Sequence, residues 1–197
     1  MKEIIIATNN QNKVKEMKEK LSKIGINAIS QSEAGIDIEV DETGETFREN
    51  AEIKATAIYD MLNKPVIADD SGLCIDYLNG APGVHSHRFA GENATSKDRI
   101  NIVLEKLKHV PDEKRTARFE CAICYIDDKG EKHFFEDKAE GVIGYEPIGS
   151  NGFGFDPIFH YEGDKRSFAE YSPEEKNAVS HRGKAVAQFI NYIKNNG

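Results

Sequence analysis

Hydrophobic positions at the start of the chain follow first a strand-like and then a helix-like pattern. The stretch "EIIIAT" at 3–8 is a short apolar run that predicts a buried strand. The segment 11–25 then predicts an amphipathic helix that ends at its glycine. Its apolar stripe consists of Val14, Met17, Leu21 and Ile24. "INAIS" at 26–30 predicts a second strand, and the order strand, helix, strand indicates an α/β fold.

The remaining pattern continues this alternation to the end of the chain. It predicts helices at about 46–63, 95–108 and 182–195, a short helix from Pro173, and strands at 66–70, 115–127 and 131–145. The segment 74–78 is compatible with one more strand, and "DDKG" joins the two long strands as a turn. Neither a repeat nor a linker interrupts the chain, so we expect one domain over 1–197.

Composition and charge narrow the class of protein. The 197 residues are 39% hydrophobic and 30% charged, with a net charge of −8, which is typical of a globular protein with an acidic surface. Such a surface disfavours binding to nucleic acid or to an anionic membrane, although one small polyanion could still bind in a local basic pocket. Apolar runs are shorter than the roughly 20 residues of a membrane span and the about 7–15 of a signal-peptide core. We therefore expect a cytoplasmic protein.

The three cysteines do not indicate a disulfide framework or a metal site. Their number is odd and low. Cys121 and Cys124 form a C-x-x-C pattern, but they lie in a predicted strand, where residues three apart point to opposite faces. We expect these two thiols and Cys74 to be packing residues.

Two adjacent carboxylates follow a short apolar strand in "KPVIADDSGLC". Asp69 and Asp70 repel each other, and burying either without a partner is costly. One interpretation is a solvated strand end with an Asp-Ser-Gly turn. The other is a metal or general-base site at the strand end. The loop "DIEVDETGE" supplies Glu42, which either favours the start of the next helix or completes an oxygen site for Mg²⁺.

Two lysines occupy positions that are unfavourable for a purely structural lysine. Lys13 lies in the first helical turn after "TNNQN", where the macrodipole disfavours a cation. Lys54 lies on the inward stripe of its helix. Lys13 is either an exposed lysine or part of an anion site built on free backbone N–H groups at the helix start. Lys54 either extends its ammonium to the surface or points at a bound anion.

Two segments near the C-terminus could recognise a base. Phe153 and Phe155 in "NGFGFDP" could stack on a base or anchor the loop in the core. His181 and Arg182 in "KNAVSHRGK" offer directed donors, or the segment simply caps a helix through Ser180. Taken together, an anion pocket, a metal pocket, an aromatic platform and donors to a base indicate an Mg²⁺-dependent enzyme acting on a nucleoside triphosphate.

Long motifs in a fixed order resemble the inosine triphosphate pyrophosphatase family, also described as XTP/dITP diphosphatases. They are "ATNNQNK", "DETGETFRENAEIKA", "ADDSGLCIDYLNGAPGVHSHRFAG", "GSNGFGFDPIF" and "EEKNAVSHRGKA". The resemblance covers essentially the whole chain. One departure is Asn9, where family members often have Gly.

The resemblance implies a fold, a reaction and partners. The fold would be an elongated α/β structure with a central mixed sheet flanked by helices, and two lobes with the active site in the cleft between them. The reaction would be Mg²⁺-dependent hydrolysis of ITP, dITP and XTP to the monophosphate and pyrophosphate, which removes deaminated purines from the nucleotide pool. The partner would be a small-molecule nucleotide, with no nucleic acid or membrane, and the family is usually homodimeric.

The resemblance also implies roles for individual residues. Asp70 would be the catalytic base and a magnesium ligand, and Glu42 the other carboxylate near the metal. The triphosphate would be held by Thr8, Asn9, Asn10, Gln11, Asn12, Lys13, Lys54 and Ser71. The base would be held by Phe153, Gly154, Phe155, Asp156, Lys176, His181 and Arg182. Asp69 is expected to be structural or to support Asp70.

Two other functions remain open from the residues alone. One is a different Mg²⁺-dependent nucleotide hydrolase, which removes a single phosphate or acts on other bases. The second is a nucleotide-binding sensor without turnover. The Glu42–Asp70 pair argues against the sensor, because a pure binding protein has no need for a water-activating acid. A scaffold protein would leave too many polar residues unexplained.

Overall fold

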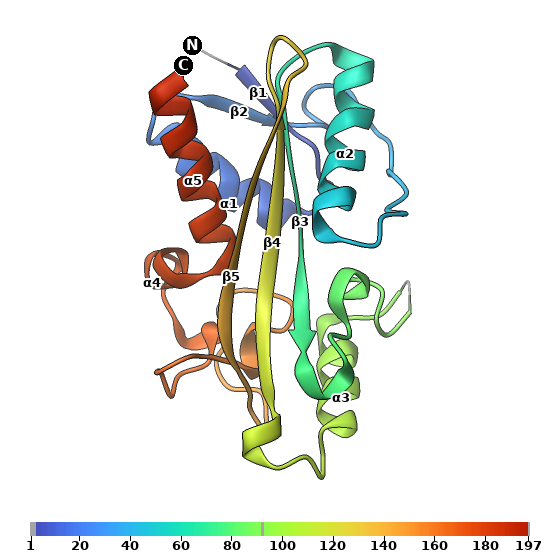
Figure 1. Ribbon diagram of the computed structural model, residues 1–197, viewed down its shortest axis with the longest axis vertical. Coiled ribbons are helices and arrows are strands. Elements are labelled where there is room, and N and C mark those ends of the chain that lie inside the picture. Colours follow the sequence, from blue (N-terminus) through green and yellow to red (C-terminus); the bar gives the residue numbers. More distant parts are fainter. Residues whose placement is uncertain (1–2, 92, 197) are drawn as a thin grey trace. The chain divides into compact units, whose positions relative to one another are not determined.

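A computed structural model describes residues 3–91 and 93–196 (Figure 1). The strands are β1 Glu3–Ile6, β2 Asn27–Ser30, β3 Val66–Ile75, β4 Thr116–Ile126, β5 Lys132–Ile143 and β6 Phe159–Tyr161. The α-helices are α1 Gln11–Ser22, α2 Phe47–Leu62, α3 Ser96–Lys106, α4 Pro173–Val179 and α5 His181–Asn196. Among the described residues, no helix is long and apolar enough to cross a bilayer.

The strands form one six-stranded sheet in the order β2-β1-β3-β4-β5-β6. β1 runs parallel to both β2 and β3, whereas β6 runs antiparallel to β5. The sheet is therefore mixed, and the predicted α/β class with a mixed sheet is confirmed.

The chain divides into two compact units, neither of which is continuous in sequence. Unit 1 comprises Met1–Asp70, Cys121–Glu136 and Ala185–Gly197, and unit 2 comprises Ser71–Glu120 and Asp137–Lys184. Strands β3, β4 and β5 and helix α5 contribute residues to both units. The predicted single domain over 1–197, with a site between two lobes, stays a prediction.

Unit 1 has apolar clusters on the two faces of its strands. Alternate residues of β1 point to opposite faces, so Ile4 and Ile6 belong to one cluster and Ile5 to the other. The first cluster packs α1 and α5 against the strands, and the second packs α2. Cys121 and Cys124 fall into different clusters, which confirms that the two thiols point to opposite faces.

Unit 2 is built around aromatic residues and helix α3. The rings of Phe119 and Phe159 lie 4.7 Å apart, and those of Phe159 and Phe168 lie 4.9 Å apart. Val103 and Leu107, from α3 and its C-terminal end, are fully buried in the same cluster. This core supports the segments on either side of β6.

One strand boundary differs from the prediction and changes the setting of the two adjacent aspartates. The sequence pattern predicts a strand that ends at Asp70, and one of its two interpretations places a turn at Ser-Gly, but β3 continues without interruption to Ile75. Leu73 and Ile75 are fully buried in unit 2, and their burial outweighs the local preference of Ser and Gly for turns. Asp69 and Asp70 therefore lie inside a strand, and the prediction of a strand end was wrong.

Arg115 is a buried cation held by backbone carbonyls. Arg115 is only 2% exposed. Its guanidinium donates hydrogen bonds to Ile143 O at 2.8 Å, Leu107 O at 2.6 Å and Gly144 O at 2.6 Å. The guanidinium also lies 4.1 Å from the centre of the Tyr145 ring. Arg115 thus ties the end of α3 to the end of β5.

We expect Arg115→Met to lower the free energy of unfolding by about 3 kcal/mol or more, because buried carbonyls lose charge-assisted hydrogen bonds. Urea denaturation followed by circular dichroism measures this loss. Arg118→Met, at a more exposed position on β4, is the control and should cost much less. A loss below about 1 kcal/mol for Arg115→Met would contradict the assigned role.

Candidate functional site

A buried lysine in unit 1 bridges two carboxylates. Lys54 Nζ, on α2, lies 2.6 Å from Glu42 Oε1 and 3.2 Å from Asp70 Oδ1. The side chains of Lys54 and Asp70 are only 11% and 8% exposed, whereas that of Glu42 is 28% exposed. The inward position predicted for Lys54 is confirmed. Its charge is directed at two acids that are far apart in sequence.

The neighbouring aspartate has a lysine of its own. Lys13 Nζ, on α1, lies 3.0 Å from Asp69 Oδ2, and the Asp69 side chain is fully buried. Successive side chains of a strand point to opposite faces, and α1 and α2 pack on opposite faces of β3. Each aspartate therefore meets a different lysine. We call these five residues, Lys13, Glu42, Lys54, Asp69 and Asp70, the acid–lysine cluster.

Burial shifts the protonation equilibria in this cluster. Removal from water raises the pKa of the Asp70 carboxyl, and the positive charges of Lys54 and Lys13 offset this only in part. Burial by itself would lower the pKa of Lys54, but the negative charges of Asp70 and Glu42 reverse that effect and raise it. Lys54 is therefore an ammonium ion at neutral pH, and Asp70 accepts a proton more readily than an ordinary aspartate.

The start of α1 differs from the prediction of free backbone N–H groups. The side chain of Asn10 caps the helix and accepts hydrogen bonds from the N–H groups of Asn12 and Lys13, at 3.0 and 3.3 Å. These two donors are satisfied within the protein, so that part of the prediction was wrong. A cap residue with an accepting side chain does this routinely.

The other residues of "TNNQNK" lie around this cap. Thr8 Oγ1 accepts from Asn10 N at 3.2 Å, and Asn9 Nδ2 donates to Ile38 O at 3.1 Å. Asn9, which departs from the family pattern, thereby connects the turn to the segment that leads to Glu42. Gln11 and Asn12 are exposed.

A second group of predicted residues comes together in unit 2. Asp156 is 3% exposed and accepts from Phe153 N at 2.8 Å and from Lys176 Nζ at 2.5 Å. Gly152 has a positive φ of 71°, and a Cβ there would collide with Asp156 Oδ2. The loop thus needs glycine at 152 to wrap around the Asp156–Lys176 ion pair.

The two phenylalanines of this loop have different environments. Phe155 is 5% exposed and belongs to the core cluster of unit 2. Phe153 is only partly buried, and its ring centre lies 4.9 Å from Lys176 Nζ and 5.5 Å from the Arg182 guanidinium carbon. Phe153 therefore has the more accessible ring, and Phe155 anchors the loop.

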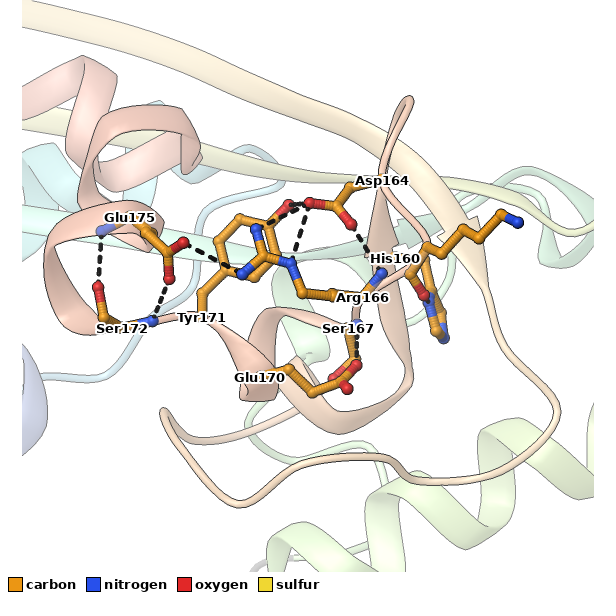
Figure 2. Close-up of polar contacts among 9 residues, drawn as sticks. His160, Asp164, Arg166, Ser167, Glu170, Tyr171, Ser172 and Glu175 are labelled. Atoms are coloured by element: carbon orange, nitrogen blue, oxygen red, sulfur yellow. Dashed lines mark hydrogen bonds and ion pairs between the residues drawn. The ribbon is translucent and has the colours of Figure 1, made fainter.

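An ion-pair network supports the helix that carries Lys176. Arg166 pairs with Asp164 at 3.0 Å and with Glu175 at 3.1 Å, and its guanidinium lies over the Tyr171 ring (Figure 2). Glu175 also accepts from Ser172 N at 2.8 Å, in the capping box of α4. Because Lys176 directly follows Glu175, this network sets the start of α4 and the place of the buried lysine.

The predicted donors His181 and Arg182 lie at the start of α5. The His181 ring stacks on Phe119 at 4.8 Å between centres, and Arg182 Nη2 donates to Ser71 Oγ at 2.8 Å. Ser180 Oγ accepts from Gly183 N at 3.1 Å, so the capping role of Ser180 is real as well. Arg182 thus connects the start of α5 to Ser71, which directly follows Asp70 in β3.

The sequence analysis did not predict two side-chain contacts of this site, and only one of them leaves a recognisable feature in the sequence. That Lys13 has an acidic partner could have been inferred, because a cation in a first helical turn suggests a nearby acid, although nothing in the sequence singles out Asp69. The contact between Asn50 Oδ1 and Gly44 N, 2.8 Å long, left no such signal. It depends on how the loop before α2 folds back.

The residues of the acid–lysine cluster fit a divalent cation that binds hard oxygen ligands. Glu42 and Asp70 offer carboxylates, and Asp70 Oδ2 is a buried oxygen without a hydrogen-bond partner among the described residues. Burying an oxygen without a partner costs free energy, unless a bound ligand supplies the missing interaction. Mg²⁺ is commonly held by one or two carboxylates together with substrate phosphates.

A separate group, Asp127, Glu131 and His133, also has oxygen and nitrogen ligand atoms close together. Asp127 Oδ1 accepts from the N–H groups of Lys129 and Glu131, and His133 Nε2 lies 3.1 Å from Asp127 Oδ2. These contacts shape the turn between β4 and β5, which accounts for the group.

We expect Asp156→Ala to lower the free energy of unfolding by about 3–5 kcal/mol, because it leaves the buried Lys176 without its partner. The double variant Asp156→Ala with Lys176→Met should recover part of this loss, since the unpaired charge is then removed. Urea denaturation of the single and double variants measures the coupling. Losses that simply add would contradict a coupled pair.

Comparison with known proteins finds a family match over nearly the whole chain. A model of the Ham1 family matches residues 4–192. The dITP/XTP pyrophosphatases of Clostridium perfringens and Bacillus subtilis are 47% and 48% identical, and each alignment covers 98% of both chains. The structure of a HAM1 protein from Coxiella burnetii superposes with a TM-score of 0.90 at 44% identity, over 99% of this chain and all of that one. The Staphylococcus aureus Ham1 structure gives a TM-score of 0.89 at 39% identity, over the full length of both. The resemblance drawn from the sequence motifs is confirmed, and the chain belongs to the Ham1 family.

Proposed function

We propose that this protein hydrolyses the non-standard purine nucleotides dITP, XTP and ITP to the monophosphate and pyrophosphate, with Mg²⁺ as cofactor. The single observation that carries the proposal is that the buried Lys54 bridges the buried Asp70 and the partly exposed Glu42. The relatives at 47% and 48% identity are named dITP/XTP pyrophosphatases. Family membership also favours a homodimer that acts in the cytoplasm on a small nucleotide.

The acid–lysine cluster supplies the groups that phosphate chemistry requires. Glu42 and Asp70 would hold Mg²⁺, which when bound neutralises phosphate charge and orients the leaving pyrophosphate. Asp70 takes a proton from the attacking water, and its raised pKa brings it closer to the working pH of a general base. Lys54 and Lys13 stabilise the negative charge that develops on the leaving group.

Each lysine keeps its ammonium in place through an acid of this chain. Lys54 is held by Glu42 and Asp70, and Lys13 is held by Asp69. Such preorganised charges need little rearrangement during the reaction, which is why they are effective. Asp69 thus has a role of its own, since it holds Lys13 from the opposite face of β3.

The group in unit 2 would recognise the base. Phe153 offers an aromatic face, and the Asp156–Lys176 pair holds the loop that carries it. Arg182 and His181 would donate to the oxygen at position 6 of hypoxanthine or xanthine, where adenine has an amino group. A site built on such hydrogen bonds discriminates strongly against a base that cannot accept them.

The first test is pyrophosphate release from dITP and XTP, compared with dATP and dGTP, in Mg²⁺ and in EDTA. We expect Mg²⁺-dependent release from dITP and XTP, and a loss of about 10²–10⁴-fold in kcat for Asp70→Asn, because the general base is removed. Asp60→Asn, at an exposed position on α2, should leave the rate unchanged. Orthophosphate as product, or equal rates with dATP, would assign the protein to another class of nucleotide hydrolase. Nucleotide binding without any product would support a sensor.

The second test addresses base recognition. We expect Arg182→Ala to reduce the preference for dITP over dATP, measured as the ratio of kcat/KM values, by roughly ten-fold or more. Arg182→Lys keeps the charge but loses the planar pair of donors, so it should recover little of the preference. A ratio that survives Arg182→Ala intact would show that another residue reads the base.

A further inference from the structure

Asn50 occupies an unusual place in the helix that carries Lys54. It lies one turn before Lys54 on α2, and it is only 1% exposed. Its Oδ1 accepts from Gly44 N at 2.8 Å, whereas its Nδ2 is buried and has no hydrogen-bond partner among the described residues. Asparagine disfavours a helix interior, and a buried donor without a partner is costly. The contact with Gly44 is the evident reason for this residue type.

Gly44 is shaped to fit this contact. A Cβ at this position would lie 2.7 Å from both Asn50 Oδ1 and Glu49 Cβ, closer than real Cβ atoms approach. Any larger residue would push the loop away from α2. Gly44 follows Glu42 by two residues, so its position directly constrains the carboxylate that contacts Lys54.

The loop before α2 carries Glu42 on irregular backbone. Residues 36–44 have no regular secondary structure. The capping box of α2 holds the next residues of the chain, because the Glu49 side chain accepts hydrogen bonds from the N–H groups of Glu45 and Thr46. Among these contacts, the bond from Gly44 to Asn50 lies nearest to Glu42 in sequence.

We propose that Asn50 is a positioning residue that holds Gly44 and thereby places the Glu42 carboxylate for Lys54 and for a divalent cation. The contact itself exists without any ligand. Its consequence for catalysis rests on the function proposed above. Asn50 acts through Glu42 and does not touch the reacting atoms.

The experiment compares Asn50→Ala with a matched control, Thr46→Ala, in the nucleotide-free protein. Amide hydrogen exchange by NMR reports the Gly44 N–H, and calorimetric titration with MgCl₂ reports cation binding. We expect Asn50→Ala to speed exchange at Gly44 by at least ~10-fold, because its acceptor is lost. We expect it to weaken Mg²⁺ binding by at least ~5-fold through the displaced carboxylate.

The two variants should separate thermal stability from cation binding, because each is expected to change one and leave the other nearly unchanged. Thr46→Ala removes the helix cap, so it lowers the melting temperature while Mg²⁺ affinity and Gly44 protection remain near those of the wild type. Asn50→Ala exchanges a poor helix former for a good one and removes a buried unpaired donor, so the melting temperature changes little. A merely structural role for Asn50 would not produce this separation.

A double variant tests the route of the effect. If Asn50 acts through Glu42, then Asn50→Ala should weaken Mg²⁺ binding no further in a Glu42→Gln background. A further loss of full size in that background would overturn the proposal. Unchanged Gly44 exchange, or Mg²⁺ binding no weaker than in Thr46→Ala, would overturn it as well.

Failure of the proposed function has a different signature. A wild type that binds Mg²⁺ but releases no pyrophosphate from dITP would refute the function and leave the positioning of Glu42 intact. Absence of Mg²⁺ binding to the wild type would overturn the role of Asn50 in cation binding. An active wild type whose kcat and Mg²⁺ requirement are unaffected by Asn50→Ala would refute the positioning role alone.

Discussion

The buried ammonium of Lys54 is the constraint on which unit 1 depends most. A lysine that is 11% exposed must have an acid beside it, because an unpaired charge in the interior is far too costly. Glu42 and Asp70 meet this need from a loop and from β3. The requirement therefore joins a helix, a strand and an irregular segment at one point. The hydrogen bond from Gly44 to Asn50 acts on the same segment.

The alternation of β3 explains how two adjacent aspartates can both be buried. Asp69 and Asp70 point to opposite faces, and each meets a lysine from the helix on its own side. Three carboxylates in this cluster face two ammonium groups, so negative charge is in excess. Burial raises the pKa of Asp70, and the charges of Lys54 and Lys13 offset this rise only in part. The excess of negative charge leaves the cluster suited to a further cation.

Unit 2 also contains a buried lysine–aspartate pair, and this pair holds a loop in place. Lys176 and Asp156 form a buried pair, and Asp156 also accepts from the backbone of Phe153. The pair thus holds a glycine-rich loop in a defined conformation, and the Arg166 network holds the helix behind it. Rigid support of this kind is what a loop needs if its aromatic ring is to bind a ligand with selectivity.

The sequence by itself determined the five α-helices and most of the strands, the inward position of Lys54 and the family, because these depend on local periodicity and on long motifs. It did not predict the short strand β6. It could not determine where β3 ends, since the turn preference of Ser71 and Gly72 is local, whereas the burial of Leu73 and Ile75 depends on distant segments. Nor could it show that the Asn10 cap occupies donors expected to be free. Only the tertiary structure decided which lysine meets which acid. Such pairing joins residues far apart in sequence, and no spacing along the chain encodes it.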